Sequence, residues 1–310
     1  MTLETDLLID RRRLKRRLFV WRIVAVLSVV VAALLLANPR GLPGAASDYV
    51  ARVTIEGVIT SDRKPAKALE MVLNDPAARA LVLVVNSPGG AVSAGETMHE
   101  LIGRIAAVKP VVAVMGATAA SAGYMISLPA ARIFAHESTL TGSIGVLLQT
   151  GEVSGLLRWL GITDETLTSG PLKNQPSLTR PMSEQGRAVM QGIIDDLFEQ
   201  FVAMVAKGRH MEPARVRELA DGRAYTGRQA LKLGLIDAIG NETDARAWLA
   251  AEKAIAVTLP ARDIRSETLR DRLFGDETEG LLGFVVKTLL SQRVSLDGGW
   301  AVWQPGMTRE

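Results

Sequence analysis

The 310-residue chain is 48% hydrophobic and has no cysteine, so it can form a large core but no disulfide bond, thiolate metal site or cysteine nucleophile. Residues 1–40 hold eight of its 36 basic residues and three of its 33 acidic residues. The remaining 28 basic and 30 acidic residues of 41–310 give no indication of nucleic-acid binding. Because His, Asp and Glu do not cluster at ligand spacing, we expect neither a metal nor a cofactor.

The N-terminus predicts a membrane anchor. Residues 18–37 are apolar except for Arg22, and twenty helical residues can cross a bilayer. The preceding segment, 1–17, is strongly basic and is expected to stay in the cytoplasm, which places the rest of the chain outside. Residues 38–48 form a Pro/Gly/Ala linker. A cleaved signal peptide is the alternative, but the apolar run is long for one and lacks a small-x-small cleavage site.

Residues 49–250 alternate between strand and helix patterns, which predicts an α/β fold with a mainly parallel sheet and crossover helices. The expected strands are 50–55, 80–85, 111–114 and 131–135, and the expected helices include 65–74, 92–108 and 183–207. We expect the last of these to begin at Ser183 and to stop at Gly208, with two shorter helices in 213–250. The C-terminal extension, 251–310, contains a strand-like run at 255–259, a charged helix near 262–274 and an amphipathic segment at 281–290.

Residues 111–127 contain the first candidate catalytic group. A β-branched run typical of a buried parallel strand leads through small residues to Ser121 and an apolar helix start. A sharp strand-to-helix turn can present a serine hydroxyl beside helix N–H groups, as in several hydrolases. The alternative is that Ser121 only caps the helix, which serines often do.

Gly89 and Gly90, which follow the predicted strand 80–85, are a second candidate. Adjacent glycines let backbone N–H groups face a cavity, as an oxyanion hole requires, and each such donor is typically worth about 3 kcal/mol. A simple Pro-Gly turn is the alternative. The glycine-spaced segment 141–146, TGSIGV, is suited to flank an extended peptide.

The candidate base for Ser121 is Lys173. The three histidines, His99, His136 and His210, have no recognisable triad context, so we expect them to be structural or surface residues. A lysine can act as a base when burial keeps its amine neutral. Lys173 stands in a Pro/Gly-framed loop that could hold it, although most lysines in loops are simply solvated.

Five motifs together resemble the signal peptide peptidase A (SppA) family, in its short single-domain bacterial form with one N-terminal anchor. They occur in the family's order over roughly residues 50–245, and it is this order that makes the resemblance specific. The motifs are NSPGG (86–90), ATAASAGYMIS (117–127), TGSIGV (141–146), SGPLK (169–173) and DGRAYTGRQALKLGLID (221–237). The resemblance implies a Clp-protease/crotonase-like fold and a serine endopeptidase with a Ser–Lys dyad.

The resemblance also implies roles for individual residues. Ser121 would be the nucleophile, Lys173 the general base, Ser143 the hydroxyl that orients the lysine, and Gly90 the oxyanion-hole donor. The backbone of an extended substrate would lie between two segments, represented by Gly89, Ala91 and Val92 and by Ile144 and Gly145.

The family resemblance further implies homo-oligomers in which neighbouring protomers complete each active site. The substrates would be apolar signal-peptide remnants, and the enzyme would lie in the bacterial inner (cytoplasmic) membrane with its catalytic domain in the periplasm or an equivalent extracytoplasmic space. Two departures from the family pattern concern Ala122–Met125, where Gly-Gly-Tyr-Tyr is commoner, and Asn174, where aspartate is frequent.

Other functions are compatible with parts of the sequence. A crotonase-like enzyme acting on acyl thioesters would share the fold, but the predicted anchor argues against it. A non-catalytic scaffold that assembles partners through helix 183–207 would not require both Ser121 and Lys173. A protease that processes other membrane proteins is not distinguished from one that degrades signal-peptide remnants.

Overall fold

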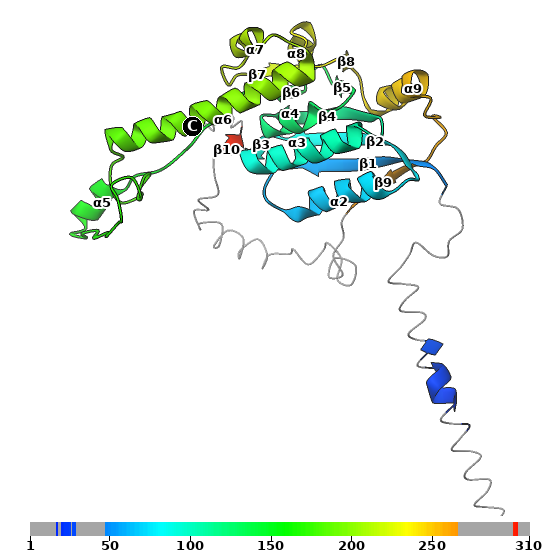
Figure 1. Cartoon of the computed structure of the whole chain (residues 1–310), viewed down its shortest axis with the longest axis horizontal. Coiled ribbons are helices and arrows are strands. Elements are labelled where there is room, and N and C mark those ends of the chain that lie inside the picture. Colours follow the sequence, from blue (N-terminus) through cyan, green and yellow to red (C-terminus); the bar gives the residue numbers. More distant parts are fainter. Residues whose placement is uncertain (1–16, 18–19, 26, 29–46, 266–299, 303–310) are drawn as a thin grey trace, which may run out of the picture. The chain divides into compact units, whose positions relative to one another are not determined.

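A computed structural model describes residues 17, 20–25, 27–28, 47–265 and 300–302 (Figure 1). Internal contacts divide the chain into two units, Met1–Ser47 and Asp48–Glu310. Most of the predicted anchor, 18–37, and all of the amphipathic segment 281–290 lie outside the described residues. Among the helices that the structure does describe, none has both the length and the apolar character needed to cross a bilayer.

The second unit alternates strands and helices along most of its length. Its strands are β1 (Tyr49–Glu56), β2 (Ala78–Ser87), β3 (Gly89–Ala91), β4 (Val111–Ala120), β5 (Arg132–Ala135), β6 (Leu140–Gly142), β7 (Ala224–Thr226), β8 (Ala238–Ile239), β9 (Ala261–Asp263) and β10 (Trp300–Val302). Its helices are α2 (Arg63–Asn74), α3 (Val92–Ala106), α4 (Ala122–Ser127), α5 (Ser154–Trp159), α6 (Glu184–Arg209), α7 (Pro213–Leu219), α8 (Gly227–Lys232) and α9 (Glu242–Lys253).

Eight strands form one sheet in the order β7-β6-β4-β2-β1-β9, with β5 pairing both β4 and β8. All pairs in this sheet are parallel except β6 with β7. The predicted α/β fold with a mainly parallel sheet is therefore confirmed. The remaining two strands, β3 and β10, form a separate antiparallel pair.

Both faces of the central strands are buried. Leu81 and Leu83 of β2 pack in the core formed with α2, α3 and α4, whereas Ala80 and Val82 pack in a second core with Leu249 of α9. Successive strand residues point to opposite faces, so a strand covered on both sides needs a continuous apolar sequence. This explains the unbroken run at 80–85.

The strand β4 has different neighbours along its length. Its first half, 112–115, pairs with β5, and its last three residues, 118–120, pair with β6. The register with β2 shifts between these halves, and the Asn86 side chain accepts the Thr118 N–H at 3.2 Å there. The strand predicted at 111–114 therefore ends too early, because β4 continues to Ala120 and the Asn86 side chain replaces the missing ladder partner.

Helix α6 begins as predicted but ends later. The Ser183 hydroxyl accepts the Gly186 N–H at 3.0 Å and caps the first turn. Gly208 lies within the helix, where a Cβ would come within 2.9 Å of the Leu128 Cβ, so this glycine allows close packing. The helix ends instead at His210, whose φ is 52°.

The prediction of a strand at 255–259 is wrong. These residues form a turn, and the guanidinium of Arg246 donates to the carbonyls of Val257 and Leu259. The strand in this region is β9, which pairs with β1 and occupies the place where the charged helix was expected to begin. The ion pair between Arg52 of β1 and Asp263 of β9 joins the two strands at the sheet edge.

Gly123 gives a test of the close packing of α4. A Cβ at this position would lie 2.8 Å from the Ser87 carbonyl oxygen of β2, so we expect Gly123→Ala to destabilise the fold by about 1–3 kcal/mol. The matched control is Gly103→Ala in α3, where no atom lies within 4 Å, and which should be neutral or stabilise by up to about 1 kcal/mol. Urea unfolding of both variants measures the difference; equal stabilities would contradict the packing described here.

Candidate active site

Ser121 lies at the junction between β4 and α4. Its N–H donates to the Gly142 carbonyl of β6 at 2.8 Å, and its own carbonyl accepts the Met125 N–H at 2.9 Å. Its backbone angles are φ 54° and ψ −119°, a conformation that L-residues rarely adopt. The strand-to-helix turn predicted around this serine is therefore sharp and strained.

The side chain of Ser121 does not cap α4. The residue is 1% exposed, and its Oγ has no hydrogen-bond partner among the described residues. A buried hydroxyl without a partner costs free energy and is unusual in folded proteins. The capping interpretation is thus excluded by this geometry, and the hydroxyl is left available to another group.

Neighbouring elements hold α4 in place. The Tyr124 hydroxyl donates to the Leu235 carbonyl at 2.8 Å, and burial raises the pKa of this tyrosine, so it remains a neutral donor. Nδ1 of His99, from α3, lies 2.9 Å from the Met125 carbonyl oxygen. This contact gives His99 the structural role that its sequence context suggested.

Gly90 lies in a strand, not in a simple turn. The Ile59 N–H donates to the Gly89 carbonyl at 2.8 Å, and the Ala91 N–H donates to the Ile59 carbonyl at 2.9 Å. A Cβ on Gly90 would come within 1.9 Å of the Ile59 oxygen, so only glycine fits here. Because backbone groups alternate along a strand, the N–H of Gly90 points away from Ile59.

The other edge of β3 is occupied by β10. Trp300, Ala301 and Val302 lie opposite Ala91, Gly90 and Gly89 in an antiparallel pair. This pairing joins segments about 210 residues apart, and the sequence contains no local signal for it. It shows that the Gly89–Ala91 edge accepts an extended strand.

The segment 141–146 lies beside Ser121 but is itself well packed. Ser143 has φ 47°, its N–H donates to the Arg223 carbonyl at 3.0 Å, and its hydroxyl donates to the Gly222 carbonyl at 3.2 Å. The Ile144 side chain is fully buried in the core, and Gly145 lies close to Gly222. In one chain the Ser143 hydroxyl therefore bonds to a backbone carbonyl and not to a lysine.

Lys173 is exposed in a turn, where its N–H donates to the Gly170 carbonyl at 3.1 Å. Its amine forms no hydrogen bond or ion pair with the part of the chain that the structure describes. It does not bond to the Ser121 hydroxyl, which has no partner among these residues. The structure thus places Ser121 beside the segment that carries Ser143, but it does not bring Lys173 to them within one chain.

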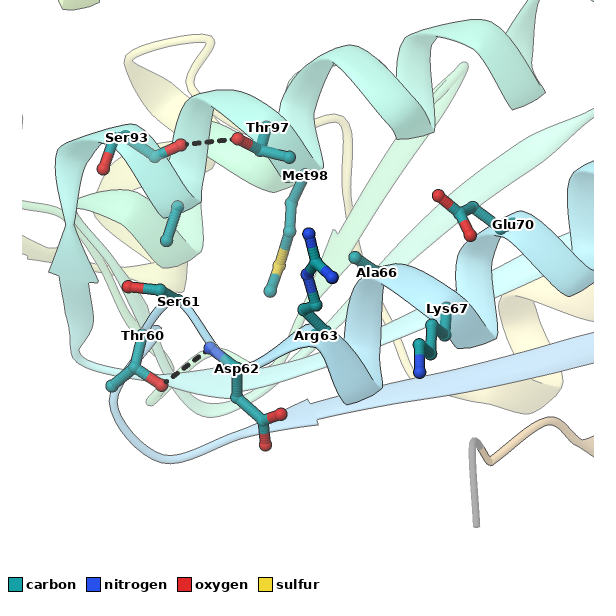
Figure 2. A pocket seen from close by; sticks show the side chains of 11 residues that line it. Thr60, Ser61, Asp62, Arg63, Ala66, Lys67, Glu70, Ser93, Thr97 and Met98 are labelled. Carbon is teal, nitrogen blue, oxygen red and sulfur yellow. Dashed lines mark hydrogen bonds between the residues drawn. The ribbon is translucent and has the colours of Figure 1, made fainter. Parts of the chain in front are cut away.

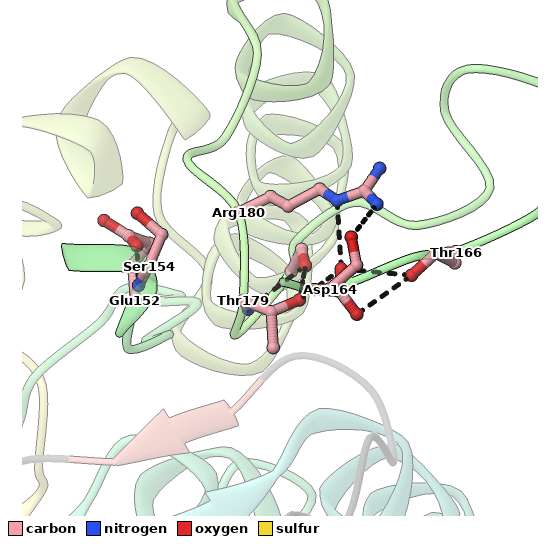
Figure 3. A network of polar contacts seen from close by, with 7 residues as sticks. Glu152, Ser154, Asp164, Thr166, Thr179 and Arg180 are labelled. Carbon is pink, nitrogen blue, oxygen red and sulfur yellow. Dashed lines mark hydrogen bonds and ion pairs between the residues drawn. The ribbon is translucent and has the colours of Figure 1, made fainter. Parts of the chain in front are cut away.

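The loop that carries Lys173 is closed by a polar network centred on Asp164 (Figure 3). The Asp164 carboxylate accepts hydrogen bonds from the Thr179 hydroxyl at 3.0 Å and from Arg180 Nε at 3.0 Å, and Thr166 lies within 3.1 Å of it. The two ends of the segment 164–180 are therefore fastened to each other. Sequence reasoning missed this network, because it joins residues about fifteen positions apart.

Comparison with known proteins gives two matching sequence profiles. The profile of Peptidase family S49 matches residues 104–256, and the Clp protease profile matches residues 59–140. The observed mainly parallel sheet with crossover helices is the Clp-protease-like fold.

Within the described residues, no group of three or more metal-ligating side chains comes together.

Several known proteins are similar in sequence to more than half of this chain. A candidate protease of Synechocystis sp. is 38% identical over 65% of this chain and 73% of its own length. A candidate signal peptide peptidase SppA of Enterococcus faecium is 37% identical over 68% of this chain and 66% of its own. Protease 4 of Salmonella typhi is 41% identical over 55% of this chain, but the match covers only 28% of that longer protein.

The Asp164 network predicts how the lysine loop responds to mutation. Asp164→Ala should increase amide hydrogen exchange in 165–178 several-fold, because the bonds to Thr179 and Arg180 are lost. Glu165→Ala, which removes a neighbouring exposed carboxylate, should leave exchange unchanged. Equal exchange in the two variants would show that Asp164 does not fasten the loop.

The same network sets a pH dependence for the wild-type loop. The hydrogen bond from Thr179 lowers the pKa of Asp164, and Thr166 and Arg180 lower it further. A carboxyl group with a lowered folded-state pKa stabilises the fold above its unfolded pKa of about 3.9. We therefore expect the loop to stay protected from neutral pH to about pH 4 and to lose protection as the pH falls further.

Proposed function

The chain belongs to peptidase family S49 and is a serine peptidase, and from this premise we propose that it is a membrane-anchored endopeptidase that uses Ser121 and Lys173 as its catalytic dyad. The observation that carries this proposal is the buried, unpartnered Oγ of Ser121 at a strained strand-to-helix turn. Such strain and unsatisfied polarity are costly, and they occur preferentially where a group must be ready to react.

In the proposed reaction, the free amine of Lys173 accepts the Ser121 proton while Oγ attacks a peptide carbonyl carbon. The N–H of Gly90 stabilises the oxyanion, and the lysine then gives its proton to the leaving amine. Water hydrolyses the resulting acyl-enzyme in the same way, with Lys173 as base and Ser121 as leaving group.

We infer that Lys173 reaches Ser121 from a neighbouring protomer. Within one chain, Lys173 lies on an exposed loop, and Ser121 Oγ has no partner among the described residues. Lys173 lies in the segment between α5 and α6, and both helices expose large apolar side chains, including Trp159 at 81% and Ile193 at 49%. Burying such side chains favours association with a second copy, which would also enclose the lysine.

The proposed substrates are extended apolar peptides such as signal-peptide remnants. The pairing of β10 with β3 supports this mode of binding, because a peptide can use the same backbone groups. The relative from Enterococcus faecium is named for signal peptide peptidase activity, which favours this substrate class. An N-terminal anchor at 18–37 would hold the enzyme at the outer face of the inner membrane, near such peptides.

The dyad is tested with single variants of the full chain. Ser121→Ala and Lys173→Ala should each lower the hydrolysis rate of a fluorogenic apolar peptide by about a thousandfold or more, because they act on the same step. Neither should change the free energy of unfolding by more than about 1 kcal/mol. Lys207→Ala, at an exposed lysine of α6, is the control and should retain full activity. Substantial hydrolysis by either dyad variant would remove that residue from the mechanism.

Completion of the site between protomers is tested by mixing the two inactive variants. If each site joins Ser121 of one protomer to Lys173 of its neighbour, randomly mixed equal amounts should recover about a quarter of wild-type activity. A site formed within one chain would recover none. Mixing Ser121→Ala with the double variant is the control, because no intact dyad can form by either route.

A further inference from the structure

The serine turn, residues 121–125, is held by contacts that the proposed mechanism does not use. Gly95 of α3 packs so closely against it that a Cβ would lie 3.1 Å from both the Ala122 Cβ and the Met125 Sδ. Other residues of α3 line a pocket of about 520 Å³ between α2 and α3, which contains charges of both signs (Figure 2). Among the described residues, no side chain that lines this pocket forms a hydrogen bond with α4. The charged groups of the pocket therefore do not fix the serine turn.

Arg209, the last residue of α6, is bonded to both ends of the segment 234–237. Its Nε donates to the Gly234 carbonyl at 2.9 Å, and its two terminal nitrogens donate to the Asp237 carboxylate at 2.6 and 3.1 Å. The same carboxylate accepts the Ile133 N–H of β5 at 2.7 Å. The Arg209 side chain is only 9% exposed, so these charge-assisted bonds are largely shielded from water. One guanidinium therefore fixes the segment 234–237 to α6, and its carboxylate partner fixes the segment to the sheet.

The segment 234–237 is in turn bonded to the serine turn. Leu235, between the two ends held by Arg209, accepts the hydroxyl of Tyr124 at 2.8 Å, and both residues are buried. Burial raises the pKa of Tyr124, and the charges of Arg209 and Asp237 act on that pKa in opposite directions, so both charges lie near the hydroxyl. A continuous series of contacts therefore connects the guanidinium at the end of α6 with the first turn of α4.

The backbone of Ser121 makes the serine turn sensitive to such support. A strained conformation persists only where the surrounding structure over-determines it. The Leu235 carbonyl contributes to this support, but it is only as well placed as the segment that carries it. A displacement of about 1 Å in a reacting group can lower a reaction rate by about a hundredfold. Contacts that fix the segment 234–237 are therefore expected to affect the reaction rate at Ser121.

We propose that Arg209 and Asp237 are positioning residues that hold the Ser121 hydroxyl in place for reaction. They act through the Leu235 carbonyl, which fixes Tyr124 in the first turn of α4. This role rests on the proposed function of Ser121 as the nucleophile. Neither positioning residue belongs to the strand edge that is proposed to bind peptide. Their substitution is therefore expected to slow the chemical step and to leave peptide binding unchanged.

The first test is Arg209→Lys in the full chain. Lysine keeps the charge, but one amine cannot bond at once to the Gly234 carbonyl and to both oxygens of Asp237. With a fluorogenic apolar peptide, kcat should fall by about tenfold to a hundredfold, while KM should change by less than about twofold. Arg217→Lys is the matched control, because Arg217 forms an exposed ion pair with Glu199 of α6, and it should keep the wild-type kcat. A wild-type kcat in Arg209→Lys would contradict the proposal.

A double-mutant cycle with Tyr124→Phe separates positioning from a general loss of stability. If Arg209 acts through the tyrosine hydroxyl, its substitution has little left to disturb once that hydroxyl is removed. In the Tyr124→Phe background, Arg209→Lys should therefore lower kcat by less than about a further twofold. Equal fold losses with and without the hydroxyl would show that Arg209 acts on the protein in some other way, and would overturn the proposal.

Amide hydrogen exchange of the segment 121–128 tests the same contacts without catalysis. This segment includes the Met125 N–H, which donates to the Ser121 carbonyl. Exchange should be several-fold faster in Arg209→Lys and unchanged in Arg217→Lys. Faster exchange supports the support of the serine turn by Arg209 even if the wild type hydrolyses no peptide, in which case only the peptidase function fails. Unchanged exchange in Arg209→Lys would overturn the proposal whether or not kcat falls.

Discussion

The backbone conformation of Ser121 is the constraint on which the candidate active site depends. A positive φ costs a non-glycine residue roughly 1–3 kcal/mol, so other contacts must hold the turn in place. The Gly142 carbonyl provides one of them by accepting the Ser121 N–H, and this bond requires β6 to lie beside the last three residues of β4. The division of β4 between two neighbours is therefore linked directly to the presentation of the serine hydroxyl.

The two residues of the proposed dyad, Ser121 and Lys173, lie in different kinds of structure. Ser121 and Gly90 belong to packed elements, in which a Cβ at Gly123 or Gly90 would collide with backbone oxygens. Lys173 belongs to an exposed loop whose ends are joined by polar contacts of Asp164. If the nucleophile lies in a packed element and the base lies in an exposed loop, the two meet only when the protein assembles. Activity would then depend on assembly.

Features determined by nearby residues could be predicted from the sequence, and features determined by distant contacts could not. Apolar runs and flanking glycines predicted the central strands. Ser121 and Gly90 could be singled out because each follows one of these strands. The late end of β4 depends on the Asn86 side chain, and the run 255–259 fails as a strand because Arg246 binds its carbonyls. The pairing of β10 has no local signal at all, and the dyad role of Lys173 rests on family resemblance.

The strand β10 gives the Gly89–Ala91 edge a resident occupant. Any peptide that pairs with the same backbone groups must displace it, and the exchange trades one set of strand hydrogen bonds for another of similar strength. The resident strand is covalently part of the chain, so its local concentration does not fall on dilution, whereas that of a free peptide does. The apparent affinity for a peptide is then the intrinsic affinity multiplied by the fraction of time that this edge of β3 is vacant. That fraction depends on the sequence of the chain's own C-terminal segment.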